Sequence, residues 1–171
     1  MGLNIREARS NDARDLSALA MISKAYWGYD DAFMEACRKG LNYYEDYIAS
    51  KNVQFWLAWL PTIEIKELTN KPRAFIDGFI AIHFGENNKA MIEALFVHPQ
   101  SMKKGIARSL FQKALSEARA KGVTEFHVQS DPNAEIFYQQ LGFKTYEMHA
   151  SGSIKERTLP MMKMHLNQTN F

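Results

Sequence analysis

The 171-residue chain has little of what marks secreted, membrane-spanning or nucleic-acid-binding proteins. Its single cysteine, Cys37, cannot form an intrachain disulfide, so a reducing, cytoplasmic setting is the simpler expectation. No segment approaches the roughly 20 apolar residues of a membrane span, and "MGLNIREARS" has no apolar core of signal-peptide length. A formal net charge of +2 gives no overall basic surface for nucleic acid. We therefore expect neither nucleic acid nor a membrane as a partner.

The chain also has no internal repeat and no linker-like segment. Hydrophobic residues make up 46% of it, which is enough to fill one core, and its length is typical of one domain. We therefore expect residues 1–171 to form a single domain.

The apolar pattern of the first third predicts one strand and two helices. Residues 3–9 alternate as a strand does, and residues 16–23 show helical spacing after the cap residues of "SND". Asp30 is placed as the N-cap of a second helix, whose apolar stripe includes Cys37. The cysteine is thereby expected in the core.

Sheet-forming segments follow. Residues 54–60, 74–84 and 90–97 are predicted to form successive antiparallel strands, because a proline or a turn stops each apolar run. The "GENN" turn at 85–88 predicts a hairpin, and residues 64–72 are expected to form a solvated loop.

Helices and strands alternate in the last part of the chain. Residues 105–121 have a wide apolar face, and Asp131 and Gly142 are placed as the cap and the stop of a later helix. Further strands are predicted at 124–130, 143–148 and 159–166. A strand, a long helix and a second strand favour a parallel crossover, so we expect an α/β (α+β) fold with a mixed sheet.

A basic turn, "MKKGIAR", separates the strand that ends at Val97 from the long helix. A helix N-terminus has unpaired N–H groups and a partial positive charge, so it attracts phosphate if the backbone can be approached closely. Gly105 would permit that approach, and the basic side chains would add charge. The alternative is a plain turn with solvated lysines.

The order of these elements, with "VHPQSMKKGIARSL" and "NAEIFYQQLGF" at their spacing, resembles the GNAT superfamily of acyl-CoA-dependent N-acetyltransferases. The resemblance covers nearly the whole chain and is most specific from Met91 to Phe143. It implies a GNAT fold: a mixed central sheet of about six to seven strands with an antiparallel N-terminal part, flanked by about four helices. A parallel pair in this sheet would splay at the cofactor site.

The resemblance also implies a binding site for acetyl-CoA. Its pyrophosphate would lie on the turn, and its pantetheine arm along the preceding strand. The implied contacts are Leu95, Phe96, Val97, Lys103, Lys104, Gly105, Ile106, Ala107, Arg108, Asn133 and Tyr138. Met102 departs from the family pattern, which has Gln or Arg there, so that side-chain contact is missing while the backbone contacts remain.

Two residues are predicted to be catalytic. The resemblance places Tyr138 near the thioester sulfur, where its phenol could protonate the departing thiolate; the alternative is a core aromatic. Glu93 is the candidate general base, and its alternative is an outward-pointing strand residue. Strand alternation puts Glu93, Leu95 and Val97 on one face if no bulge intervenes, although the family often has a bulge here.

The family usually binds its acceptor between the first two helices and the loop before the last strand, which correspond to "YWGYDD" and "SGSIKERT". We therefore expect Trp27, Tyr29 and Asp30 to contact an amine of a small molecule or peptide. The alternatives are that the aromatic rings pack at a helix corner and that Asp30 caps the second helix. His83 and His98 have no spacing typical of a metal site, so no metal is expected.

The sequence thus predicts an N-acetyltransferase that transfers an acetyl group directly from acetyl-CoA to a primary amine in a ternary complex. A non-catalytic acyl-CoA-binding regulatory module is the alternative, encouraged by Met102. A nucleotide-phosphate protein is disfavoured, because the glycine pattern is neither a P-loop nor a dinucleotide fingerprint. Family members often dimerise, so a second copy of the chain is a candidate partner.

Overall fold

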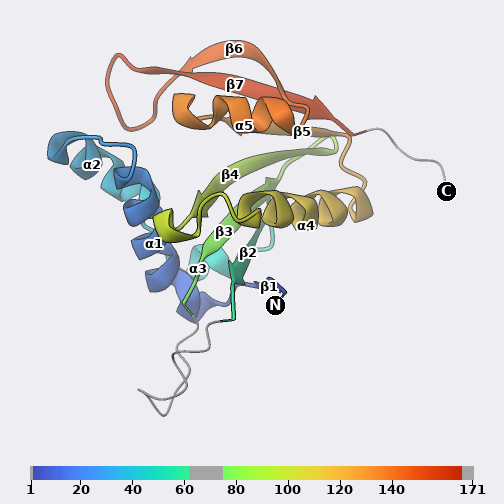
Figure 1. Ribbon diagram of the computed structural model, residues 1–171. Coiled ribbons are helices and arrows are strands. Elements are labelled where there is room, and N and C mark those ends of the chain that lie inside the picture. Colours follow the sequence, from blue (N-terminus) through green and yellow to red (C-terminus); the bar gives the residue numbers. More distant parts are fainter. Residues whose placement is uncertain (1, 62–74, 167–171) are drawn as a thin grey trace.

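A seven-stranded mixed sheet forms the centre of the computed structural model, which describes residues 2–61 and 75–166 (Figure 1). The strand order is β1-β2-β3-β4-β5-β7-β6. The strands are β1 (Asn4–Glu7), β2 (Val53–Trp59), β3 (Gly78–Phe84), β4 (Lys89–Val97), β5 (Glu125–Gln129), β6 (Lys144–Ala150) and β7 (Thr158–His165). Within this described sheet, β4 and β5 form the one parallel pair, which confirms the mixed α/β fold.

Helices cover both faces of the sheet. They are α1 (Ala13–Ala25), α2 (Asp31–Arg38), α3 (Glu45–Ile48), α4 (Ile106–Ala120) and α5 (Glu135–Gln140). One buried cluster packs the apolar face of α4, together with Tyr138 of α5, against the sheet. A second cluster packs α1 and Ile48 of α3 against the opposite face of β2, β3 and β4. In Figure 1, α4 lies across the middle strands and α5 lies alongside the β6–β7 pair.

The seven predicted strands are all present, and the GENN hairpin is confirmed by Gly85 N–H donating to the Lys89 carbonyl at 2.9 Å. The cysteine is free and buried, as expected. β3 begins at Gly78, four residues later than predicted. The one-turn helix α3 was not predicted, because four residues are too few to show helical periodicity. The loop expected at 64–72 lies outside the described residues.

Strand β4 contains a β-bulge at Glu93. Ala94 pairs with Ala81 of β3 and Ile92 pairs with Ile82, so Glu93 is the extra residue. The pairing of β4 with β5 ends at the same place, with Ile92 opposite Val128. Beyond this point β4 continues to Val97 against β3 alone in the described register, and the two parallel strands separate as predicted.

Gly78 sets how closely α4 approaches the sheet. A Cβ at this position would meet Ile106 Cγ2 and the Phe96 carbonyl oxygen at 3.0 Å, and Leu110 Cδ1 at 3.2 Å. Gly78→Ala should therefore push α4 away and lower the free energy of unfolding by about 1–3 kcal/mol, as overpacking does. Urea unfolding midpoints measure the loss.

Gly152→Ala is the matched control, because a Cβ there meets nothing within 4 Å. It should leave stability unchanged or raise it slightly by restricting the unfolded chain. Equal midpoints for the two variants would contradict the tight packing at Gly78.

Candidate functional site

A cavity of about 350 Å³ lies where β4 and β5 separate. Its walls come from the end of β4, the end of β5 with the turn that follows, the start of α4, and parts of α1, α5 and β7. The lining residues include Ile92–Val97, Val128–Asp131, Met102, Ala107, Asn133, Ala134, Phe137, Tyr138, Ser23, Lys24 and Trp27. The sheet thus opens into a pocket bounded by both of the motifs that the sequence singled out.

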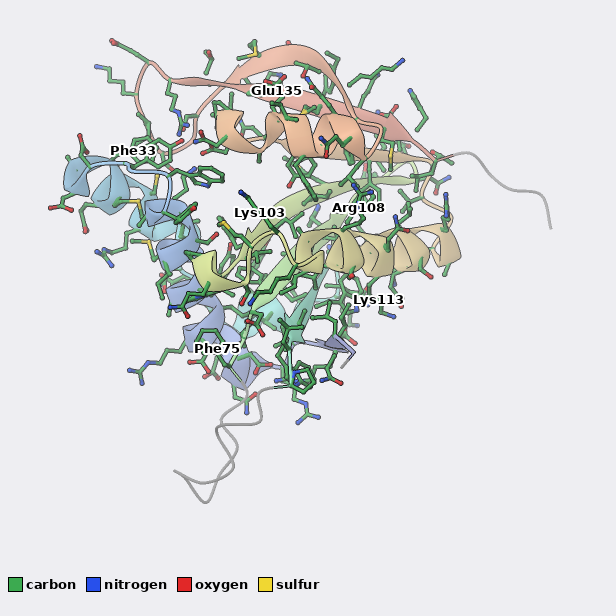
Figure 2. All side chains as sticks on the ribbon, viewed as in Figure 1. Phe33, Phe75, Lys103, Arg108, Lys113 and Glu135 are labelled. Atoms are coloured by element: carbon green, nitrogen blue, oxygen red, sulfur yellow. The ribbon has the colours of Figure 1, made fainter. Side chains whose placement is uncertain are left out.

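The α4 N-terminus lies at one end of this cavity and has no side-chain cap. Lys103 and Gly105 both have left-handed backbone, with φ of 61° and 80°. Lys103, Lys104 and Arg108 are exposed, and Figure 2 shows Lys103 and Arg108 on the side of α4 toward α5. Uncapped amides beside exposed cations are an arrangement that favours an anion, and the phosphate contact stays a prediction.

Other residues of the turn are fixed by packing. Ile106 is 1% exposed and packs in the core, so its side chain holds the start of α4 in place. Met102 lines the cavity and packs against the same apolar cluster. An apolar side chain suits this contact, which accounts for Met102 where the family has a polar residue.

The end of β4 supplies Leu95, Phe96 and Val97 to the cavity wall. Leu95 and Val97 pack on the α4 face, whereas Ala94 and Phe96 pack on the α1 face. Ala90 and Ile92 also lie on the α4 face, so the bulge has switched the alternation by one residue.

Glu93 lies on the opposite side from Leu95 and Val97, because the bulge is present and the condition for a common face is not met. Its carboxylate accepts a hydrogen bond from the hydroxyl of Tyr47, a residue of α3. Burial, and then the Glu93 carboxylate, raise the pKa of the Tyr47 phenol. Glu93 is an exposed residue that lines the cavity, so solvent and a ligand can both reach it.

Tyr138 is 5% exposed and lines the cavity. Its ring packs edge-on against Phe137 and Phe143, with ring centroids 5.4 and 5.5 Å away. Burial raises the pKa of the phenol above its ordinary value, so Tyr138 carries its proton at neutral pH. Tyr138 is therefore a core aromatic that also borders the cavity, and its place near a thioester sulfur stays a prediction.

Asn133 lies at the cavity with its amide directed toward Tyr29 and Asp131. Nδ2 donates to the Tyr29 hydroxyl at 3.1 Å and to Asp131 Oδ1 at 2.9 Å. The cofactor contact expected of Asn133 stays a prediction, and its main-chain N–H is occupied by Asp131 Oδ1 at 2.9 Å.

A polar cluster joins the two segments that were expected to bind the acceptor. Tyr29 lies in the turn between α1 and α2, and Arg157 lies in the loop between β6 and β7; Arg157 Nη2 donates to the Tyr29 hydroxyl at 2.9 Å. The Tyr29 hydroxyl is also 3.0 Å from Asp131 Oδ2, and Lys24 of α1 forms an ion pair with the same oxygen. We call Lys24, Tyr29, Asp131 and Arg157 the polar cluster.

Two other predicted acceptor residues lie outside this cluster. Trp27 lines the cavity and is 44% exposed. Asp30 is the N-cap of α2, with Oδ1 accepting from Phe33 N–H at 2.8 Å, so the alternative cap role is correct.

Sequence reasoning missed three residues of the site. Lys24 and Arg157 reach it only through tertiary packing, and Tyr47 lies on the unpredicted helix α3. Asp131 was recognised only as a cap; it does cap Asn133 N–H, but it also pairs with Lys24. The loop that contains Arg157 had been singled out, but nothing in its sequence distinguishes this arginine.

Comparison with known proteins identifies the class to which this fold and cavity belong. A family model described as "Acetyltransferase (GNAT) domain" matches residues 69–167, more than half of the chain. The chain therefore belongs to the GNAT acetyltransferase family. The human cysteine-rich protein 2-binding protein is 40% identical over 60 residues, which are 35% of this chain and 8% of that protein. The chain thus spans only a small fraction of that relative.

Solved structures share the fold over nearly the full chain. PaiA N-acetyltransferase of Thermoplasma acidophilum, solved with coenzyme A, has a TM-score of 0.74 at 20% identity, covering 97% of this chain and 100% of that one. A GCN5-related N-acetyltransferase of Rhodopseudomonas palustris has a TM-score of 0.73 at 18% identity, covering 97% of each chain. The ribosomal-protein-S18-alanine N-acetyltransferase of Escherichia coli has 0.66 at 13%, covering 99% of each.

Neither a metal cluster nor a membrane span is found in the part of the chain that the structure describes. Residues 2–61 and 75–166 contain no group of three or more His, Cys, Asp or Glu side chains arranged to hold a metal ion. No helix within those ranges is long and apolar enough to cross a bilayer.

The polar cluster should make stability depend on pH through Asp131. Burial alone would raise the pKa of this carboxyl, but hydrogen bonds from Lys24, Asn133 and Tyr29 hold it below its ordinary value. Asp131→Asn should cost about 1–3 kcal/mol at pH 7, because it leaves partly buried donors without their charged acceptor. The difference should shrink as the pH falls below about 4, because the carboxyl of the unfolded wild-type chain takes up a proton there and that of the folded chain follows at lower pH.

Chemical unfolding of both proteins between neutral and acidic pH measures this difference. Asp30→Asn is the control, because asparagine caps a helix as well as aspartate does and the change should be small at every pH. If the difference in free energy of unfolding between the wild type and Asp131→Asn stays constant with pH, the charged carboxylate has no stabilising role.

Proposed function

We propose that the protein is an acetyl-CoA-dependent N-acetyltransferase that transfers an acetyl group to a primary amine by direct transfer in a ternary complex. One observation carries this proposal: a single cavity is bordered by Ala107 at the uncapped start of α4, by the unpaired end of β4 and by Tyr138. Family membership and the coenzyme A complex of the T. acidophilum relative support acetyl-CoA as the donor.

The chain offers suitable groups for each part of acetyl-CoA. The main-chain N–H groups of Ile106, Ala107 and Arg108 suit the pyrophosphate, with Lys103 and Lys104 adding positive charge. The pantetheine arm carries amides, and residues 95–97 of β4 have main-chain groups that β5 no longer pairs with in the described register. The arm would therefore take the place that β5 leaves.

The chemistry needs a base for the acceptor and an acid for the leaving group. As the amine nitrogen bonds to the acetyl carbon, the C–S bond breaks and the coenzyme leaves as a thiolate. Tyr138 supplies the proton to the sulfur, and Glu93, held by Tyr47, removes the proton from the amine through water. Burial raises the pKa of Tyr138, so the phenol keeps its proton until the thiolate forms beside it.

We also propose a domain organisation, a cellular location and an oligomeric state. A single sheet that uses strands from both ends of the described chain supports one domain over residues 1–171. The free, buried Cys37 is compatible with a reducing cytoplasm. A homodimer is proposed from the family resemblance alone.

Gly105→Val should abolish binding of acetyl-CoA. Gly105 has φ of 80°, which a β-branched residue adopts only with strain, and a side chain there would project into the open space that the pyrophosphate needs. We expect a loss of affinity of more than about 10-fold, or 1.4 kcal/mol, by titration calorimetry.

Gly122→Val separates strain from binding. Gly122 lies just past the other end of α4, has φ of 74° and also has open space at its Cβ. Both variants should lose stability to a similar extent. Under conditions in which it is folded, however, Gly122→Val should bind acetyl-CoA with the affinity of the wild type. Equal affinities for the two variants would contradict the proposed phosphate site.

Tyr138→Phe should lower kcat by about 100-fold or more, the usual contribution of a general acid, and leave acetyl-CoA binding intact. Tyr44→Phe, at a tyrosine that is 63% exposed, is the control and should not change turnover. Release of free thiol with a panel of amines measures kcat.

If Tyr138→Phe and Glu93→Gln both turn over normally, the assigned chemistry is wrong even though the fold stands. Binding of acetyl-CoA without turnover of any amine would favour the regulatory module.

A further inference from the structure

The charges around the cavity form two groups, a negative one at Glu93 and a positive one at the polar cluster. Glu93, with Tyr47, borders it from the bulge of β4. Lys24 and Asp131 border it from α1 and from the turn after β5, and Arg157 reaches the same carboxylate with Nη2 3.5 Å from Oδ2. The polar cluster contains two cations and one carboxylate, so its net charge is positive.

Asp131 has no lone pair left for a substrate ammonium group. Its two oxygens accept from Lys24, from the Tyr29 hydroxyl, from the main-chain and side-chain nitrogens of Asn133, and at longer range from Arg157. A carboxylate offers about four lone-pair sites, and these donors fill them. Asp131 therefore neutralises part of the cluster and does not itself hold an amine.

The two cations retain donors that could bind an anion. Among the described residues, Lys24 donates only to Asp131, although an ammonium group has three hydrogens to donate. Arg157 uses Nη2 for Tyr29 and Asp131, so its other nitrogens have no hydrogen-bond acceptor in the described part of the chain. A carboxylate is the group that fits a guanidinium with free, forked donors.

Aromatic rings hold these cations in place. Tyr29 and Phe33 are stacked with centroids 3.9 Å apart. Lys24 Nζ lies 5.1 Å from the Tyr29 ring, and Arg157 Cζ lies 4.9 Å from the Phe33 ring. The Lys24 and Arg157 side chains are only 15% and 19% exposed, so their charges are preorganised and weakly screened.

We propose that the acceptor is zwitterionic: a small amine that also carries a carboxylate, of the amino-acid class. The carboxylate would bind Lys24 and Arg157, and the amine would point toward Glu93, which attracts the ammonium form and removes its proton. The cavity of about 350 Å³ must also admit the thioester, which favours a small acceptor. This inference rests on the proposed acetyltransferase function.

The test compares amino acids with their own carboxamides, which keep the amine and lose only the negative charge. Acetyl-CoA and the wild-type protein are used, with thiol release as the readout and a polyamine added to the panel. We expect kcat/KM for at least one amino acid to exceed that for its amide by about 10- to 100-fold, mainly through KM, as for a lost charge-assisted contact.

Variants of the polar cluster test whether it causes the preference for amino acids over their amides. Arg157→Gln and Lys24→Met should each bring the acid-to-amide ratio of kcat/KM toward one, because the substrate carboxylate loses a cationic partner while the amide has no carboxylate to lose it. Arg157→Lys, which keeps the charge, should retain part of the preference. Lys155→Gln removes an exposed cation from the same loop and should leave the ratio unchanged.

Each outcome separates this inference from the function on which it rests. If amides or the polyamine are acetylated as well as the amino acids, or if the ratio survives both Arg157→Gln and Lys24→Met, the zwitterionic acceptor is wrong while the enzyme activity stands. If acetyl-CoA binds but no panel member is acetylated, the proposed function fails and the inference fails with it.

Discussion

The structure depends on the loss of pairing between two parallel strands in the middle of its sheet. β4 and β5 stay together only as far as Ile92 and Val128, and a bulge at Glu93 turns the rest of β4 by one residue. Main-chain groups that leave a ladder must find other partners, because a buried, unpaired N–H or C=O costs free energy. The amides of the proposed pantetheine arm would meet that need. The same break in the sheet creates the cavity, exposes the backbone that lines it and directs Glu93 away from Leu95 and Val97.

Helix α4 has two roles that act at different parts of its length. Its buried face fills the larger core cluster, and its close fit against Gly78 holds it on the sheet. Its first turn is left without a cap, with left-handed backbone at Lys103 and Gly105 just before it. The packing of the core thus keeps this uncapped turn in a fixed position relative to the end of β4. This is how a binding site can be preorganised by residues that never touch the ligand.

The sequence predicted the fold and the α4 turn well, because both depend on local patterns. Alternation, helical spacing, and the glycine and lysines of "KKG" act within a few residues of each other. The bulge could not be predicted from the residues, since "AMIEALFV" carries no glycine or other local mark at Glu93. The roles of Lys24 and Arg157 were also out of reach, because their shared partner Asp131 is distant from both in sequence.

The proposed coenzyme end of the cavity and the polar cluster differ in how their residues are distributed along the sequence. The proposed coenzyme end comes from one continuous stretch, the end of β4, the turn and the start of α4, whereas the polar cluster is assembled from α1, the turn after β5 and the β6–β7 loop. A substitution in the loop that contains Arg157 therefore alters the polar cluster and leaves the sequence of the proposed coenzyme end unchanged. If the proposed assignment holds, residues of the β6–β7 loop could be changed to alter acceptor selectivity while the donor site keeps its sequence.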